Sequence, residues 1–176
     1  MRWQAVWIYF CMVTVFGGSC TAAEEWKPYR YPKDGFVVEF PSAPKPEDAL
    51  GDTRKILRFR QYWVDGSEVA FGVGAALYRH NVMTSVSSDQ ALRSAIEGAG
   101  SAMGCSIRSE REVTLAGTMA REVVFDRCER AGMVAKQRFY VVGDWLYQAM
   151  VLGTIPDLET APNVKRFLES FGLIAE

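Results

Sequence analysis

Hydrophobic residues gather most densely between residues 133 and 153, on both sides of the pair Gly143 and Asp144. Aromatic and β-branched side chains, which favour strands, dominate both halves of this segment. In the second half, from Trp145 to Leu152, large apolar side chains occupy odd and even positions alike. A strand that is apolar on both faces lies in the interior of a sheet. The pattern therefore predicts a hairpin over 133–153 whose second strand is central.

The same pattern of apolar and polar positions predicts the remaining strands. Phe36–Phe40 is a short strand, and the run Pro41–Pro46 is an extended loop because proline cannot donate a regular ladder hydrogen bond. Four further strands form two hairpins, 54–65 with 68–78 and 106–115 with 121–128. The even positions of the strand over 68–78 are small, including Gly72 and Gly74. We therefore expect a helix to pack closely on that face.

Two segments have the apolar spacing of helices. In the segment 88–103 the apolar side chains fall on one face at helical spacing, and Ser87 with Gln90 fits a capping box. The second segment, 162–171, has a proline in its first turn and a stripe of four apolar side chains. Short turns join most neighbouring strands, so the sheet is mainly antiparallel. The predicted fold class is α+β, with two helices that bury their stripes against the sheet.

The first 23 residues have the pattern of a secretory signal. Arg2 is the only charge, a short apolar stretch follows, and small residues precede Glu24. The apolar stretch is shorter than the about 20 residues that a membrane helix needs. A buried N-terminal helix is the alternative interpretation. Residues 24–34, with two prolines, form an exposed lead-in, and residues 35–174 form a single domain.

Two modes of cleavage fit the leader. Ordinary signal peptidase would cut after Ala23. Alternatively, Cys20 is the lipid-modified cysteine of a bacterial lipoprotein, although Gly17 occupies a position where such motifs prefer leucine. The sequence does not decide between them. In the second case, the lipid on Cys20 would be the chain's contact with a membrane.

Composition excludes several classes of function. The 176-residue chain has a net charge of −1, so no strongly basic surface indicates nucleic-acid binding. The chain has none of the short motifs that mark phosphate, dinucleotide or nucleophilic sites. His80 is the only histidine, and its sequence neighbours offer no second metal ligand, so we interpret it as a loop residue without a catalytic role. We predict neither a cofactor nor a catalytic residue.

Charged and aromatic residues have structural interpretations. Acidic and basic residues alternate along the hairpin 106–128, which indicates cross-strand ion pairs rather than paired catalytic acids. Trp26, Tyr29 and Tyr31 lie in the lead-in, where they either dock on the domain or contact a partner. Five further aromatic residues lie in strand patterns, which favours core packing, and a ligand groove lined by them is the alternative: Trp63, Tyr78, Tyr140, Trp145 and Tyr147.

Two cysteines, Cys105 and Cys128, remain once the leader is removed. An even number of cysteines in an exported domain indicates a disulfide. If Ala116 and Gly117 form a two-residue turn, the register of the hairpin places Cys105 opposite Cys128. The alternative is two buried free thiols. Redox catalysis is disfavoured because the chain has no Cys-x-x-Cys pair.

The chain resembles the PsbP-like domains, which share their fold with the Mog-type nuclear import factors. Within that group it is most similar to small exported bacterial members, including the DcrB-like envelope lipoproteins. The features that carry the resemblance are the strand with its proline at 36–41, the Gly117 hairpin leading into 121–125, the hairpin at 138–147 and the ending 166–171. The resemblance implies an antiparallel sheet sandwiched between helices. It also implies an accessory or binding role, and it supplies no catalytic motif that maps onto this chain.

The leading functional hypothesis is a non-enzymatic envelope protein that binds a protein partner or supports a larger assembly. The rival hypothesis is a small-molecule carrier or an enzyme with a pocket between sheet and helix. A purely structural domain is a third class. A deep pocket with converging polar groups would favour the rival, whereas a filled interior would favour partner binding.

Overall fold

The computed structural model describes residues 25–48, 52, 54–66, 68–155 and 157–174. The predicted leader and the candidate lipidation site Cys20 lie outside these residues. No helix among the described residues has the length and hydrophobicity needed to cross a membrane.

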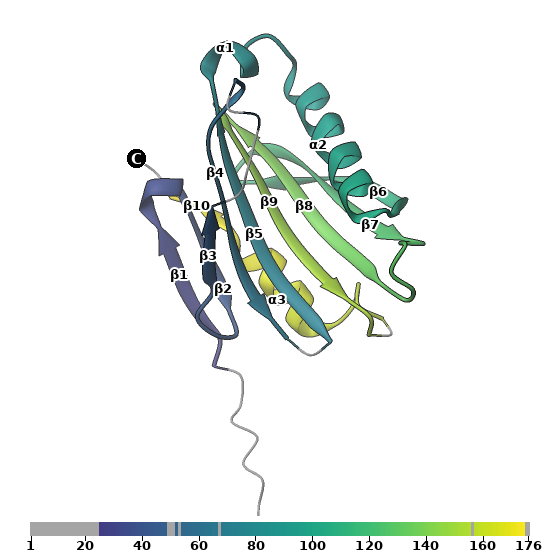
Figure 1. The fold of residues 1–176 in the computed structure, drawn as a ribbon. Helices are drawn as coiled ribbons and strands as arrows, with labels where there is room; N and C mark the ends of the chain where they lie inside the picture. The colour runs from purple at the N-terminus through teal and green to yellow at the C-terminus, as the bar shows by residue number, and fades with distance from the viewer. Residues whose placement is uncertain (1–24, 49–51, 53, 67, 156, 175–176) are drawn as a thin grey trace, which may run out of the picture.

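A seven-stranded antiparallel sheet forms the centre of the molecule (Figure 1). Its strands are β3 (Lys45–Asp48), β4 (Ile56–Asp65), β5 (Val69–Tyr78), β6 (Ser106–Leu115), β7 (Thr118–Asp126), β8 (Val134–Val142) and β9 (Trp145–Gly153). They are arranged in the order β3-β4-β5-β9-β8-β7-β6. Strand β9 is the middle strand, which confirms the position predicted from its apolar side chains on both faces.

A smaller antiparallel sheet packs beside the large one and consists of β1 (Lys27–Tyr31), β2 (Phe36–Phe40) and β10 (Gly172–Leu173), in the order β1-β2-β10. The predicted lead-in is therefore part of the fold from Lys27 onwards. A 3-10 helix, η1 (Pro32–Asp34), joins β1 to β2. Trp26, Tyr29 and Tyr31 pack against the core, so these aromatic side chains dock on the domain.

The proline-rich segment after β2 contains a strand that the sequence analysis missed. Strand β3 pairs with β4 at the edge of the sheet, with Pro46 opposite Tyr62. An edge strand tolerates proline because only one side of it needs ladder hydrogen bonds. The prediction of an extended loop over Pro41–Pro46 was therefore wrong for its last two residues, Lys45 and Pro46, which belong to β3.

Helices cover the two faces of the large sheet unequally. Helix α2 (Ser88–Met103) packs on β8 and β7, whereas α3 (Pro162–Ser170) packs on the opposite face against β2 and β9. Figure 1 shows α2 in front of the green strands and α3 behind the sheet. The short helix α1 (His80–Met83) follows β5 at one end of the sheet. The fold is the predicted α+β sandwich with a mainly antiparallel sheet.

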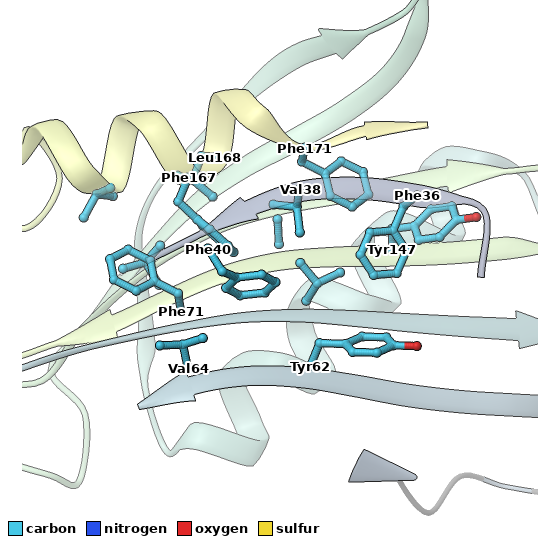
Figure 2. Close-up of a cluster of buried hydrophobic side chains, with 14 of the residues drawn as sticks. Phe36, Val38, Phe40, Tyr62, Val64, Phe71, Tyr147, Phe167, Leu168 and Phe171 are labelled. Carbon is cyan, nitrogen blue, oxygen red and sulfur yellow. The ribbon is translucent and has the colours of Figure 1, made fainter. Parts of the chain in front are cut away.

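The larger core lies between the large sheet, the small sheet and α3. Figure 2 shows Phe167 and Leu168 of α3 pointing toward side chains of β2 and of the large sheet. Aromatic rings fill this space. For example, Phe171 stacks on Tyr140, with ring centres 4.9 Å apart, and on Phe36 at 5.6 Å. This interior is closed by side-chain packing.

A second, smaller core lies under α2. Leu92 and Ile96 of the helix are buried against β7 and β8. The Ser87 hydroxyl accepts a hydrogen bond from the Gln90 backbone nitrogen at 3.2 Å, which is half of the predicted capping box. Gly104 ends the helix in the left-handed conformation, at φ 60°, which glycine adopts without strain.

The predicted disulfide between Cys105 and Cys128 is present, with the two Cα atoms 3.9 Å apart. Ala116 and Gly117 form the two-residue turn, and Leu115 pairs with Thr118. A bulge at Arg108 then shifts the register by one residue, so the cysteines lie just beyond the last regular pairs. The Glu129 nitrogen also donates to the Gly104 carbonyl at 2.9 Å. Together these contacts fasten the end of α2 to the outer end of the β6–β7 hairpin.

The small residues of β5 have a different cause from the one predicted. A Cβ atom on Gly72 would lie 2.5 Å from ring carbons of Trp63, and one on Gly74 would lie 3.4 Å from the Phe59 ring. The groups that approach this face are therefore aromatic side chains of the neighbouring strand β4. The expectation of a closely packed helix on this face was wrong.

Candidate functional site

One face of the large sheet is covered by a helix over only part of its width. Helix α2 packs mainly on β8 and β7, and Figure 1 shows β4 and β5 extending beyond it on the same side of the sheet. We call this surface the open face. Its partly exposed side chains are Phe59, Gln61 and Trp63 of β4 and Gln148 of β9, and the buried Gly72, Gly74 and Met150 lie between them.

The register of the sheet places these residues side by side. Trp63 lies opposite Gly72, which in turn lies opposite Met150 of β9. Residues directly opposite each other on neighbouring strands point to the same face. Because Gly72 has no side chain, the Trp63 ring lies directly over its backbone. Trp63 remains partly exposed and belongs to neither hydrophobic core.

A chain of hydrogen bonds separates the open face from the core under α2. The Gln148 amide nitrogen donates to the Gln137 side-chain oxygen at 2.6 Å. The Gln137 amide nitrogen in turn donates to the Met103 sulfur at 3.3 Å. Gln137 is only 1% exposed, so these two bonds satisfy a buried amide. They hold the edge of the open face in a fixed arrangement beside α2.

An acidic hollow of about 420 Å³ lies at one end of the open face, where β4 turns into β5. We use this name for the space bordered by Glu47, Trp63, Asp65, Glu68, Arg130, Met133 and Leu152. Three carboxylates and one guanidinium therefore surround an aromatic ring and two aliphatic side chains. The hollow is open to solvent.

A second hollow, of about 290 Å³, lies at the other end of the open face, between α1, α2 and strands β5 and β9. Its lining is mostly apolar and includes Val82, Met83 and Leu146. Lys55 is the only charged residue among the lining residues, and Tyr78 contributes a phenol whose pKa is raised by burial. The small side chains of Ala91 and Ala95 leave this space between α2 and the sheet.

His80 does not lie in a loop, because it is the first residue of α1. Its Nδ1 atom is 3.0 Å from a carboxylate oxygen of Asp144, in the β8–β9 turn. The side chain of His80 is largely exposed. No group of three or more His, Cys, Asp or Glu side chains within the described part of the chain could hold a metal ion.

The alternating charges of the β6–β7 hairpin form ion pairs, as predicted. Glu122 is buried and accepts hydrogen bonds from Arg111 at 2.6 Å and from Arg138 at 2.6 Å. Burial raises the pKa of the Glu122 carboxyl, but the hydrogen bonds and charges of Arg138, Arg111 and Lys136 outweigh burial and hold its pKa below the usual range. Arg138 and Lys136 also donate to the Leu168 and Glu159 carbonyls. The network therefore fastens α3 and the segment before it to the sheet.

Asp34 is a buried acid that no motif in the sequence marks. Its carboxylate accepts a hydrogen bond from the Tyr62 hydroxyl and forms an ion pair with Arg58, at 3.2 Å. Burial and the neighbouring Asp34 raise the pKa of Tyr62 to about 12. The Arg58 guanidinium lies 5.2 Å from the centre of the Trp145 ring. This cluster joins η1 to the sheet.

Comparison with solved structures identifies the architecture. The solution structure of cyanobacterial PsbP (CyanoP) from Synechocystis sp. PCC 6803 superposes with a TM-score of 0.58. The match covers 89% of this chain and 96% of CyanoP, at 12% sequence identity. The fold is PsbP-like. This confirms the fold that the sequence resemblance implied, while the narrower resemblance to DcrB-like lipoproteins stays a prediction.

A crystal structure of a protein of unknown function from Pseudomonas aeruginosa is also similar, with a TM-score of 0.44 and 15% identity over 76% of this chain and 86% of that one. No protein-family model matches the sequence. No curated protein sequence matches it either.

Proposed function

We propose that this chain is an exported envelope protein whose domain binds a protein partner through the open face, without catalysing a reaction. The proposal rests on the open face, which is the part of the large sheet that α2 does not cover. Trp63 and Phe59 lie on that surface outside both cores. A partner of complementary shape would cover apolar area there that is now in contact with water.

Two features support a location outside the cytoplasm. The domain contains the Cys105–Cys128 disulfide, and structural disulfides persist in oxidising compartments. The PsbP-like fold is consistent with such a location. Export through the leader and anchoring through Cys20 remain parts of the proposal.

The packing of the interior favours partner binding over chemistry in a deep pocket. Side chains such as Phe36, Phe167 and Phe171 fill the space between the large sheet and α3. The buried charged groups Glu122 and Asp34 are engaged in contacts that join elements of the fold. An accessory role of the kind implied by the family resemblance therefore agrees with this arrangement.

A matched pair of variants tests the proposal. Gln61→Trp adds bulk in the middle of the open face, whereas Met119→Trp adds a similar side chain at a position that is 50% exposed, on the β6–β7 hairpin. Chemical crosslinking in the native envelope, followed by mass spectrometry, identifies bound proteins. We expect wild type and Met119→Trp to capture the same partner and Gln61→Trp to lose it. Equal capture by all three would contradict the proposal.

A second candidate function rests on the hollow between α1, α2 and the sheet. Its apolar lining and single lysine suit a small molecule with an apolar body and an anionic group. Calorimetric titration of the domain with a fatty acid such as decanoate tests this alternative. Ala95→Phe would fill the hollow and abolish such binding, while the partner captured through the open face would be unaffected.

A further inference from the structure

The acidic hollow combines a flat aromatic surface with carboxylates at its rim. The Trp63 ring is held over Gly72, so it lies along the sheet, and the same side chain lines the hollow. The face of an indole ring attracts cations through its π electrons, by about 0.5–1 kcal/mol at exposed sites and more when water is excluded. The hollow therefore has one of the two elements of a site for an organic cation.

The second element is unneutralised negative charge. Within the described residues, none of the carboxylates of Glu47, Asp65 and Glu68 has an ion-pair or hydrogen-bond partner. By contrast, Asp48, which follows Glu47 in β3, forms an ion pair with Arg60 at 2.9 Å. Arg130 is the only cation in the lining, so negative charge predominates around the hollow.

The arrangement favours a long organic cation over a metal ion. The described acidic residues include no group close enough together to coordinate a metal. The volume of about 420 Å³ holds roughly fourteen water molecules at ~30 Å³ each. Such a space accommodates a complete lysine or arginine side chain. Met133 and Leu152 would contact its aliphatic stem while its charged end reaches the carboxylates.

We propose that the acidic hollow receives a lysine or arginine side chain of the protein that binds the open face. This inference rests on the proposed function and adds the chemistry of the partner. The segment that docks carries apolar side chains over Phe59 and Trp63, and a basic residue next to them. The charge of the hollow selects the partner, and the uncovered sheet provides the contact area.

Synthetic peptides of opposite charge provide the direct probe. Fluorescein-labelled peptides with four Leu-Arg repeats and with four Leu-Glu repeats are titrated with the disulfide-intact domain, and fluorescence anisotropy reports binding. We expect the arginine peptide to bind at least tenfold more tightly than the glutamate peptide. We also expect its affinity to fall between 50 and 200 mM salt, as charge pairing requires. Failure of the wild-type domain to bind the arginine peptide would overturn the proposal.

Two triple variants with the same change in net charge locate the binding. Glu47→Gln, Asp65→Asn and Glu68→Gln together neutralise the hollow. The control neutralises three exposed carboxylates that do not line it, through Glu25→Gln, Glu97→Gln and Glu169→Gln. We expect the hollow variant to weaken binding of the arginine peptide at least tenfold and the control variant to weaken it less than threefold. Equal weakening would show attraction by net charge alone and would refute the site.

The aromatic element has its own test. Trp63→Leu removes the ring and leaves every charge in place, so we expect a three- to tenfold loss of affinity for the arginine peptide. Gly72→Val displaces the ring from the sheet and should have a similar effect if circular dichroism shows that the variant folds. Unchanged affinity in Trp63→Leu would exclude the ring from the site. If the hollow variant still captures the envelope partner as wild type does, the inference fails while the proposed function stands.

Discussion

Removal of the buried carboxylate of Glu122 is the sharpest test of the network that joins the sheet to α3. Three cations surround it. Arg111 is 64% exposed, whereas the side chains of Arg138 and Lys136 are only 17% and 15% exposed. Glu122→Gln keeps the shape of the side chain and removes its charge. The two shielded cations then lose the anion that compensates their burial.

The expected cost follows from that burial. Breaking a buried ion pair by removing one partner costs about 3–5 kcal/mol, because an uncompensated charge stays in a dry environment. A domain of this size has a total stability of about 5–15 kcal/mol, so the loss is a large fraction of it. Arg111→Ala is the matched comparison. Arg111 contacts the same carboxylate but is exposed, and an exposed pair contributes about 0–1 kcal/mol.

Urea unfolding of the disulfide-intact domain measures both free energies and adds a pH test. The pKa of Glu122 is lower in the folded state than in the unfolded chain. The carboxylate therefore stabilises the fold fully above the unfolded pKa of about 4.3, and this contribution is lost as the pH falls through the folded pKa. Wild type and Glu122→Gln should differ most at pH 7 and should converge in acid. Two results would refute this account. One is a difference in unfolding free energy below about 1 kcal/mol at pH 7, which is less than a third of the expected loss. The other is a difference that is the same at pH 3 as at pH 7.

Other predictions concern the remaining contacts. Replacing Cys105 and Cys128 by serine opens the loop that the disulfide closes and should cost roughly 3 kcal/mol in urea unfolding; an unchanged midpoint would contradict the chain-entropy argument. Tyr62→Phe removes the donor to Asp34 and should cost about 1.5–3 kcal/mol, whereas a neutral effect would show that the cluster is already hydrated. Palmitate labelling of the full-length protein distinguishes the two cleavage modes, since Cys20→Ala abolishes labelling only if the protein is a lipoprotein.

Sequence patterns located the strand that is apolar on both faces and the helices whose apolar side chains recur at helical spacing. The central position of β9 followed from its two apolar faces, and α2 begins and ends at the predicted residues, Ser88 and Met103. The disulfide followed from the even number of cysteines and from hairpin geometry, because a two-residue turn sets the register of the strands that leave it. The residue pattern did not indicate the bulge at Arg108, which shifts the register by one residue.

The strands that were missed lie at sheet edges. Strand β1 is mostly exposed and contains Pro28, and β3 contains Pro46, so their polar sequences resemble loops. Both are strands because a neighbouring strand offers a ladder on one side. The small residues of β5 correctly indicated that other groups lie close to its backbone. They did not reveal that these groups are the Trp63 and Phe59 rings of the adjacent strand rather than a helix.

The candidate site depends on tertiary arrangement more than on any motif. Phe59 and Trp63 are four residues apart in one strand, which places them on the same face. Only the structure shows that α2 stops short of them. Asp65 and Glu68 flank the β4–β5 turn, and the pairing of β3 with β4 brings Glu47 to the same hollow. The pairing of His80 with Asp144 likewise joins residues that are 64 positions apart.

The central claim is that the open face contacts a protein partner, and site-specific photocrosslinking tests it most directly. A photoreactive amino acid at Gln61 lies in the middle of this face, and the same amino acid at Met119 or Glu97 lies outside it. After illumination of cells that express the full-length protein, we expect one discrete crosslinked species from position 61 and none from the other two positions. Crosslinks to the same protein from all three positions, or none from position 61, would contradict the claim.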